Sequence, residues 1–167
     1  MPPPSNGKDG VALITGGSRG IGKAIAERLS EDGFDTVTLG RTSGDVQADV
    51  GDAESVKAAF DEVREKYGPV LVLVNNAGER QDGLAIRMSA DQWSSVIHTN
   101  LDGAFYCTRR ALDDMLKARW GRIVNISSVV MSVSMTPGVT ALQVIPLRAI
   151  SRAIVRVSES IPALAAP

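Results

Sequence analysis

Residues 11–22 read Val11-Ala12-Leu13-Ile14-Thr15-Gly16-Gly17-Ser18-Arg19-Gly20-Ile21-Gly22. The continuous apolar run that opens this stretch is typical of a buried strand. After the glycines, apolar residues from Ile21 to Leu29 recur on one face of a helix, and Gly33 is placed to end it. Glycines between a strand and a helix let backbone N–H groups approach a phosphate at the positive end of the helix. The stretch therefore predicts a strand, a phosphate-binding turn and a helix.

Short apolar runs alternate with helical patterns along the rest of the chain up to residue 127. Four more strands are expected, at Thr36–Leu39, Val46–Val50, Val70–Val74 and Arg122–Ser127. One helix is expected from an N-cap at Asp52 to about Tyr67, and another from Ser89 to about Trp120 with an irregularity near Gly103. Such alternation predicts an α/β fold with a doubly wound parallel sheet, which has helices on both faces.

Composition and charge exclude several classes of protein. The chain has 167 residues, 44% of them hydrophobic, and 18 basic residues against 19 acidic ones. This balance argues against binding to nucleic acid or to a membrane surface through bulk charge. One cysteine and one histidine leave no multi-cysteine metal site or disulfide framework, so we expect no metal. We expect Cys107 and Trp93 to be packing residues and His98 to lie on a helix surface.

No targeting or membrane segment is expected. Residues 1–7 lack the apolar core of a secretory signal. The longest uncharged stretch, 123–147, is broken by Pro137 and Pro146, which makes it a poor membrane span. The prediction is a cytoplasmic protein with no membrane partner.

Three further motifs make the pattern specific: Asn75-Asn76-Ala77-Gly78, the run from His98 to Phe105, and the run from Trp120 to Val129. Together with residues 15–22 they resemble the short-chain dehydrogenase/reductase family. Within it the chain is most similar to the β-ketoacyl-[acyl-carrier-protein] reductases, whose pattern also fits Asp82-Gly83-Leu84 and Arg87-Met88. The resemblance covers about residues 8–130. Reductases of sugars, steroids and polyketides share these motifs, so the branch stays open.

The resemblance implies a single NADP-binding Rossmann-type domain over residues 1–167, with a family-like core at 8–130 and an atypical tail at 139–167. For its parallel sheet we expect the strand order 3-2-1-4-5. It implies an oxidoreductase that reduces a ketone, either a small molecule or one bound to a carrier protein. Asn100 would support a proton-relay water, and Ser128 would hydrogen-bond the substrate carbonyl, with Ser127 as the adjacent candidate. The alternatives are a polar helix residue at Asn100 and an ordinary strand-end serine at Ser128.

The resemblance also implies cofactor-binding residues. Those expected at the phosphates are Gly16, Ser18, Arg19 and Ile21; those at the adenine are Asp49 and Val50; those at the ribose are Asn76, Ala77 and Gly78. Full-length relatives are expected to form homo-oligomers, while the state of this chain is unknown.

The end of the second strand predicts the choice of cofactor. An NAD enzyme of this fold needs a carboxylate there for the ribose 2′-hydroxyl. Residues 39–43 contain none, and the first acid is Asp45. Arg41 and Arg19 are instead suited to a 2′-phosphate as charge-assisted donors, which predicts NADP(H). The alternative is that Arg41 points to solvent.

The chain departs from the family pattern where the resemblance implies a Tyr-x-x-x-Lys pair, near Ala141 and Ile145. The only tyrosines are Tyr67 and Tyr106, and no lysine follows Lys117. We interpret the change after about residue 138 as a shift of reading frame, with a diverged short form as the alternative. A sheet truncated after about the fifth strand, with that strand as an exposed edge, is then expected.

Three functions are consistent with these residues: an NADPH-dependent ketone reductase by descent, impaired by the missing pair; a non-catalytic NADP(H)-binding or partner-pairing module; and an inactive fragment.

Overall fold

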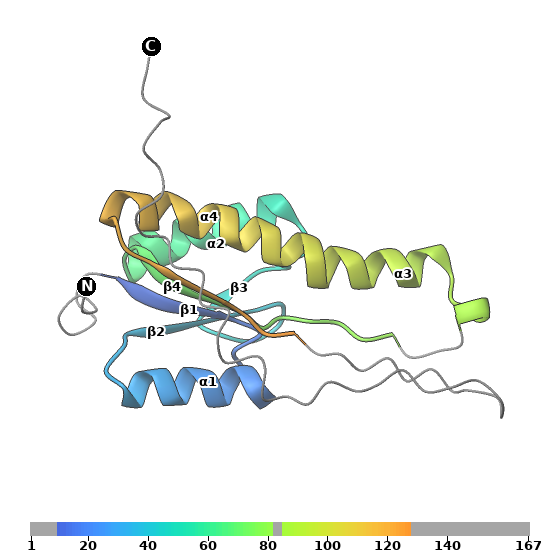
Figure 1. Cartoon of the computed structure of the whole chain (residues 1–167), viewed down its shortest axis with the longest axis horizontal. Helices are drawn as coiled ribbons and strands as arrows, with labels where there is room; N and C mark the ends of the chain where they lie inside the picture. Colours follow the sequence, from blue (N-terminus) through green and yellow to red (C-terminus); the bar gives the residue numbers. More distant parts are fainter. Residues whose placement is uncertain (1–9, 82–84, 128–167) are drawn as a thin grey trace, which may run out of the picture.

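A computed structural model describes residues 10–81 and 85–127. Its strands form one parallel sheet in the order β3-β2-β1-β4-β5, as predicted (Figure 1). Every neighbouring pair of strands is parallel. The strands are β1 (Val11–Thr15), β2 (Thr36–Gly40), β3 (Val46–Gln47), β4 (Val70–Asn75) and β5 (Arg122–Asn125).

Helices cover both faces of the sheet, because parallel strands need crossover connections. Helix α1 (Gly20–Glu31) lies on one face, and α2 (Ala53–Lys66) and α4 (Gly103–Ala118) lie on the other (Figure 1). Helix α3 (Ala90–Ile97) continues into α4 through a π-helical turn, η3 (His98–Asp102), and a short 3₁₀ turn, η2 (Ala85–Arg87), precedes it. Within the described residues, no helix is long and apolar enough to cross a bilayer.

The helix boundaries follow from local signals in the sequence. The Asp52 carboxylate accepts a hydrogen bond from the Glu54 backbone N–H and caps α2, as predicted. Ser89 and Gln92 form a capping box at the start of α3. Gly33, with φ +88°, follows the end of α1 in the left-handed region that favours glycine.

Three boundaries differ from the sequence prediction. The third strand ends at Gln47, because the chain turns at Asp49, whose carboxylate accepts from the Gly51 N–H and whose N–H donates to Ser55. The fifth strand ends at Asn125, where the pairing with β4 stops. The segment expected as one helix is split by η3, directly before Gly103, where the irregularity was expected.

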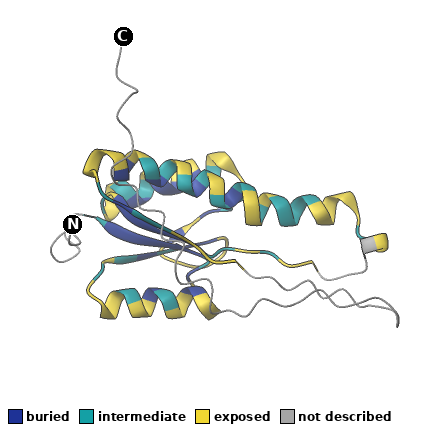
Figure 2. Ribbon diagram, in the orientation of Figure 1, coloured by how far each residue is buried: buried dark blue, intermediate teal, exposed yellow. Residues whose placement is uncertain are grey.

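The core lies on both sides of the sheet (Figure 2). Alternate residues of β1 point to opposite faces, so Leu13 packs on the α2 and α4 side and Ile14 on the α1 side. All of β1 and β4 is buried, which explains their continuous apolar runs. In the described part of the chain β5 pairs with β4 alone, and Val124 is 37% exposed. Whether residues beyond 127 cover this edge stays a prediction.

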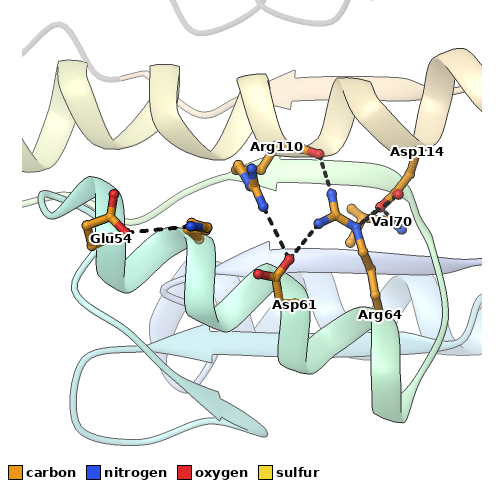
Figure 3. Close-up of polar contacts among 7 residues, drawn as sticks. Glu54, Asp61, Arg64, Val70, Arg110 and Asp114 are labelled. Atoms are coloured by element: carbon orange, nitrogen blue, oxygen red, sulfur yellow. Dashed lines mark hydrogen bonds and ion pairs between the residues drawn. The ribbon is translucent and has the colours of Figure 1, made fainter.

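A partly buried ion pair joins α2, α4 and β4 (Figure 3). The Asp114 carboxylate is 5% exposed, accepts two hydrogen bonds from Arg64 Nε at 2.9 and 3.0 Å, and accepts a third from the Val70 N–H at 3.0 Å. The Arg64 guanidinium also donates to the Arg110 carbonyl and to Asp61. These contacts hold α4 against the strand that leads into the candidate site.

Two of the packing predictions have opposite outcomes. Cys107 is buried, as expected, and burial raises the pKa of its thiol to about 12. The prediction for Trp93 is wrong, because this residue is 59% exposed. It lies on α3, which extends beyond the end of the sheet. His98 lies on the surface, as expected.

Candidate functional site

The Thr15 hydroxyl joins the loops that follow β1 and β4. It donates to the Val74 carbonyl at 3.3 Å and accepts from the Asn76 and Ala77 N–H groups at 3.0 and 2.9 Å. The Asn76 amide in turn donates to the Thr15 and Gly16 carbonyls at 3.0 and 3.2 Å. These hydrogen bonds therefore join the two loops at the carboxyl end of the sheet, where open α/β sheets bind ligands.

The glycines after β1 are required by close approach and by backbone conformation. A Cβ on Gly22 would lie 2.3 Å from the Gly16 oxygen and 2.4 Å from Asn76 Nδ2. Gly16 and Gly20 have φ angles of +64° and +54°, and a Cβ on Gly20 would meet nothing within 4 Å. The N-terminus of α1 has no side-chain cap. Open space beside these N–H groups suits a phosphate, because the helix dipole favours negative charge there.

A hollow of about 730 Å³ lies along these loops and the loop after β2. All ten residues that the sequence predicted for the cofactor line it: Gly16, Ser18, Arg19, Ile21, Arg41, Asp49, Val50, Asn76, Ala77 and Gly78. The fold therefore brings together residues that are up to 62 positions apart in the chain (78 − 16). We refer to this hollow as the dinucleotide groove, after the ligand that the sequence predicts for these residues.

The charged lining of the dinucleotide groove is mixed. Arg19, Arg41 and Arg80 line it together with Asp49 and Glu79. One carboxylate oxygen of Asp49 accepts a hydrogen bond from the Gly51 N–H at 2.9 Å. The three guanidinium groups outnumber the two carboxylates, so a phosphate-rich ligand is compatible with this lining.

A second hollow of about 960 Å³ adjoins the groove and shares with it several lining residues, including Ile21, Asn76 and Glu79. We refer to it as the adjoining hollow. Asn100 and Ser127 also line it. Ser128, Ala141 and Ile145 lie outside the described residues, so the structure leaves the predicted catalytic serine and the positions of the missing pair untested.

Both polar atoms of the Asn100 side-chain amide form hydrogen bonds with the backbone of Glu79. Its Oδ1 accepts from the Glu79 N–H at 2.7 Å, and its Nδ2 donates to the Glu79 carbonyl at 2.9 Å. The partner is 21 residues away, so this is a tertiary contact rather than a local backbone bond. The side chain ties the loop after β4 to η3, and π-helical turns are frequent at functional sites. A role for Asn100 toward a water stays a prediction.

Two residues of the site were missed by the sequence reasoning. The Glu79 carboxylate has its pKa lowered by hydrogen bonds from Gln81 and Ser95, and the charge of Arg41 lowers it further. The Asn75 amide donates to Asn125 Oδ1 at 2.8 Å, while its own buried Oδ1 has no hydrogen-bond partner in the described structure. A signal for Glu79 was available, since it directly follows Asn75-Asn76-Ala77-Gly78 at the end of a strand.

No group of three or more histidine, cysteine, aspartate or glutamate residues in ranges 10–81 and 85–127 is arranged to hold a metal ion. The polar atoms of the site are amides, hydroxyls, guanidinium groups and carboxylates, which can form hydrogen bonds to a nucleotide.

Comparison with known proteins matches this arrangement. A model of the short chain dehydrogenase family matches residues 10–140. The chain is 42% identical over 145 residues to the 3-oxoacyl-[acyl-carrier-protein] reductase FabG of Staphylococcus aureus, covering 76% of this chain and 58% of that protein. It is 47% identical over 123 residues to the 3-oxoacyl-[acyl-carrier-protein] reductase MabA of Mycobacterium avium, covering 70% of this chain and 48% of that protein. The chain thus spans about half of the length of these relatives.

A solved structure supports the same relationship. The ligand-free aldohexose dehydrogenase of Thermoplasma acidophilum superposes with a TM-score of 0.68 and 36% identity, over 74% of this chain and 52% of that chain. The sequence motifs, the strand order and the residues around the glycine loop all indicate the same family. The chain belongs to the short-chain dehydrogenase family, in which it is most similar to 3-oxoacyl-[acyl-carrier-protein] reductases.

Proposed function

We propose that this chain is an NADP(H)-binding domain of a reductase that converts a ketone to an alcohol. The observation that carries the proposal is that one hollow is lined by all ten residues predicted for the cofactor. The proposed domain occupies residues 1–167, with its family-like core at 8–130. The relatives' names suggest a 3-oxoacyl thioester on an acyl carrier protein as the substrate class.

The residues of the dinucleotide groove fit the cofactor. Backbone N–H groups at the start of α1 would hold the pyrophosphate, since they carry no side-chain cap. Arg41 and Arg19 would hold the 2′-phosphate, because guanidinium groups form charge-assisted, bidentate contacts with phosphate. Asn76 and Gly78 would flank the ribose from a loop that is hydrogen-bonded to Thr15. When bound, NADPH supplies a hydride to the carbonyl carbon.

The adjoining hollow would take the ketone. In this proposal Ser128 donates a hydrogen bond to the substrate carbonyl, and Asn100 supports a water near the reacting groups. The reduction also needs a proton donor for the carbonyl oxygen, and the resemblance would put the family's tyrosine and lysine near Ala141 and Ile145, where this chain has neither residue. A positioned general acid contributes roughly 10²–10⁴-fold, so we expect slow reduction or none.

The absence of the expected tyrosine and lysine favours a second candidate function. A non-catalytic module that binds NADP(H), or that pairs with a complete reductase, needs the groove but not the proton donor. Alanine and isoleucine at positions 141 and 145 are compatible with that role. An inactive fragment would have neither property.

Two measurements on the full chain separate these candidates. Titration with NADPH and NADH, followed by cofactor fluorescence, tests the groove; we expect tighter binding of NADPH. Turnover of a 3-oxoacyl thioester tests catalysis. Binding without turnover supports the module, and turnover comparable to that of a complete reductase supports the enzyme and requires another proton donor. Absence of dinucleotide binding leaves the inactive fragment.

The role of Arg41 has its own test. The substitution Arg41→Ser removes contacts to a charged phosphate, each worth about 1.5–3 kcal/mol, so the NADPH affinity should fall by roughly 10–100-fold. NADH affinity should change little. Arg28→Ser is the matched control, because Arg28 lies at the far end of α1 and pairs with Asp32. Equal affinities of the unmodified chain for NADPH and NADH would contradict the assignment.

A further inference from the structure

Glu79 is held more firmly than an ordinary surface glutamate. Its backbone N–H and carbonyl are both bonded to the Asn100 amide, at 2.7 and 2.9 Å. Its carboxylate accepts from Ser95 Oγ at 3.0 Å, from Gln81 Nε2 at 2.9 Å and from Thr99 Oγ1 at 3.4 Å. Backbone and side chain are therefore both anchored to α3 and η3, so the negative charge has a defined place.

That place is on the dinucleotide groove. Glu79 lines both the groove and the adjoining hollow. Arg41 lines the groove from the loop after β2, while Glu79 lines it from the loop after β4, and β1 lies between these two strands. The ordinary pKa of a glutamate already lies well below neutral pH, and hydrogen bonds from Gln81 and Ser95 lower that of Glu79 further, so the carboxylate is ionised at neutral pH. The Arg41 charge lowers the pKa in the same direction, and Arg41 and Glu79 line the same groove.

We propose that Glu79 is a specificity-determining residue of the dinucleotide groove, whose fixed negative charge weakens the binding of a 2′-phosphate relative to a 2′-hydroxyl. This inference rests on the proposed function, since it assumes that Arg41 receives the 2′-phosphate. A phosphate that reaches Arg41 is repelled by the Glu79 carboxylate, which lines the same groove. The groove thus contains a cation that favours NADP(H) and an anion that limits the preference.

The other charged groups that line the groove do not cancel the effect of Glu79 on a 2′-phosphate. Arg19 and Arg80 line it with positive charge, and Asp49 adds a second carboxylate. Asp49 is oriented by the Gly51 N–H, whereas Glu79 is oriented toward α3 and η3. Neutralising Glu79 changes the balance from three positive and two negative charges to three and one.

The test is Glu79→Gln in the full chain. Glutamine keeps the size of the side chain and an acceptor for Ser95, but removes the charge. The dissociation constants for NADPH and for adenosine 2′,5′-bisphosphate should fall by about two- to tenfold, as expected for one unit charge acting across solvent-exposed distances. Those for NADH and 5′-AMP should fall by a smaller factor, because these ligands lack the 2′-phosphate. The gain should shrink as salt is raised, because salt screens the repulsion.

Two matched variants separate charge from structure. Glu31→Gln makes the same change in net charge on an exposed position near the end of α1, which lines neither hollow, and should leave the NADPH to NADH ratio unchanged. Glu79→Asp keeps the charge and should keep the ratio near that of the unmodified chain, even if it loosens the contacts with Ser95 and Thr99.

The outcomes distinguish this inference from the proposed function. If the unmodified chain binds neither NADPH nor NADH, the proposed function is wrong, and the inference fails with it. If the unmodified chain binds NADPH but Glu79→Gln leaves the ratio unchanged, or weakens both cofactors equally, the inference alone is wrong. The same holds if Glu79→Asp shifts the ratio as much as Glu79→Gln does.

Discussion

The substitution Thr15→Val tests whether one hydroxyl holds the two loops of the site together. Thr15 is 2% exposed, and valine has nearly its shape. The change removes three hydrogen bonds, and two of them leave the Asn76 and Ala77 N–H groups without their acceptor. An unsatisfied buried donor costs about 1–3 kcal/mol. Since both residues are half-buried and water reaches them in part, we expect a total loss of about 2–4 kcal/mol in the free energy of unfolding.

Urea denaturation of the full chain measures this loss as a lower midpoint at an unchanged slope. Thr36→Val is the matched control: Thr36 is a half-buried β2 residue whose hydroxyl makes no hydrogen bond to the described residues, and its replacement should change stability by less than about 1 kcal/mol. NADPH affinity should fall for Thr15→Val alone, because the loop that contains Asn76 loses its support. Equal losses of stability for the two variants would refute the reasoning.

Two further predictions concern the core. Asp114→Ala should lower the free energy of unfolding by about 3 kcal/mol in urea denaturation, because the Val70 N–H loses its acceptor. This is at the low end for a broken buried ion pair, since Arg64 keeps its bonds to Asp61 and to the Arg110 carbonyl. A loss below about 1 kcal/mol would contradict this. Cys107 should react with a thiol reagent only on unfolding. Its folded pKa of about 12 lies above the ordinary 9.0, so the unfolded state loses its proton first and this thiol should reduce stability as pH rises from 9.0 to about 12; rapid native-state labelling at pH 8 would contradict its burial.

Local patterns were sufficient to predict most of the fold. The apolar runs of β1 and β4 are buried on both faces, so their sequence shows strand without alternation. Asp52 and Gly33 mark helix ends through hydrogen bonding and backbone conformation that depend on adjacent residues alone. The short third strand was overestimated, because Asp49 forms a turn with Gly51 through a side-chain contact that apolar periodicity does not reveal.

The candidate site was predicted only in part. The residues of the dinucleotide groove belong to motifs at strand ends, and parallel strands bring their carboxyl ends to one edge. Trp93 was misplaced, because its apolar side chain gives no indication that α3 extends past the sheet. The partners of Asn100 were also missed, since a bond to a residue 21 positions away depends on how two segments pack.

By itself, the sequence determined the family and the glycine loop, because both rest on local residue types, and the strand order was then expected from the family resemblance. Only the tertiary structure decided which polar groups meet. The Thr15 hydroxyl contacts residues 61 and 62 positions away, and Glu79 joins Asn100 across 21 positions. A hydrogen bond forms only when donor and acceptor are within about 3 Å, so such pairs depend on the packed arrangement of strands and helices rather than on spacing along the chain.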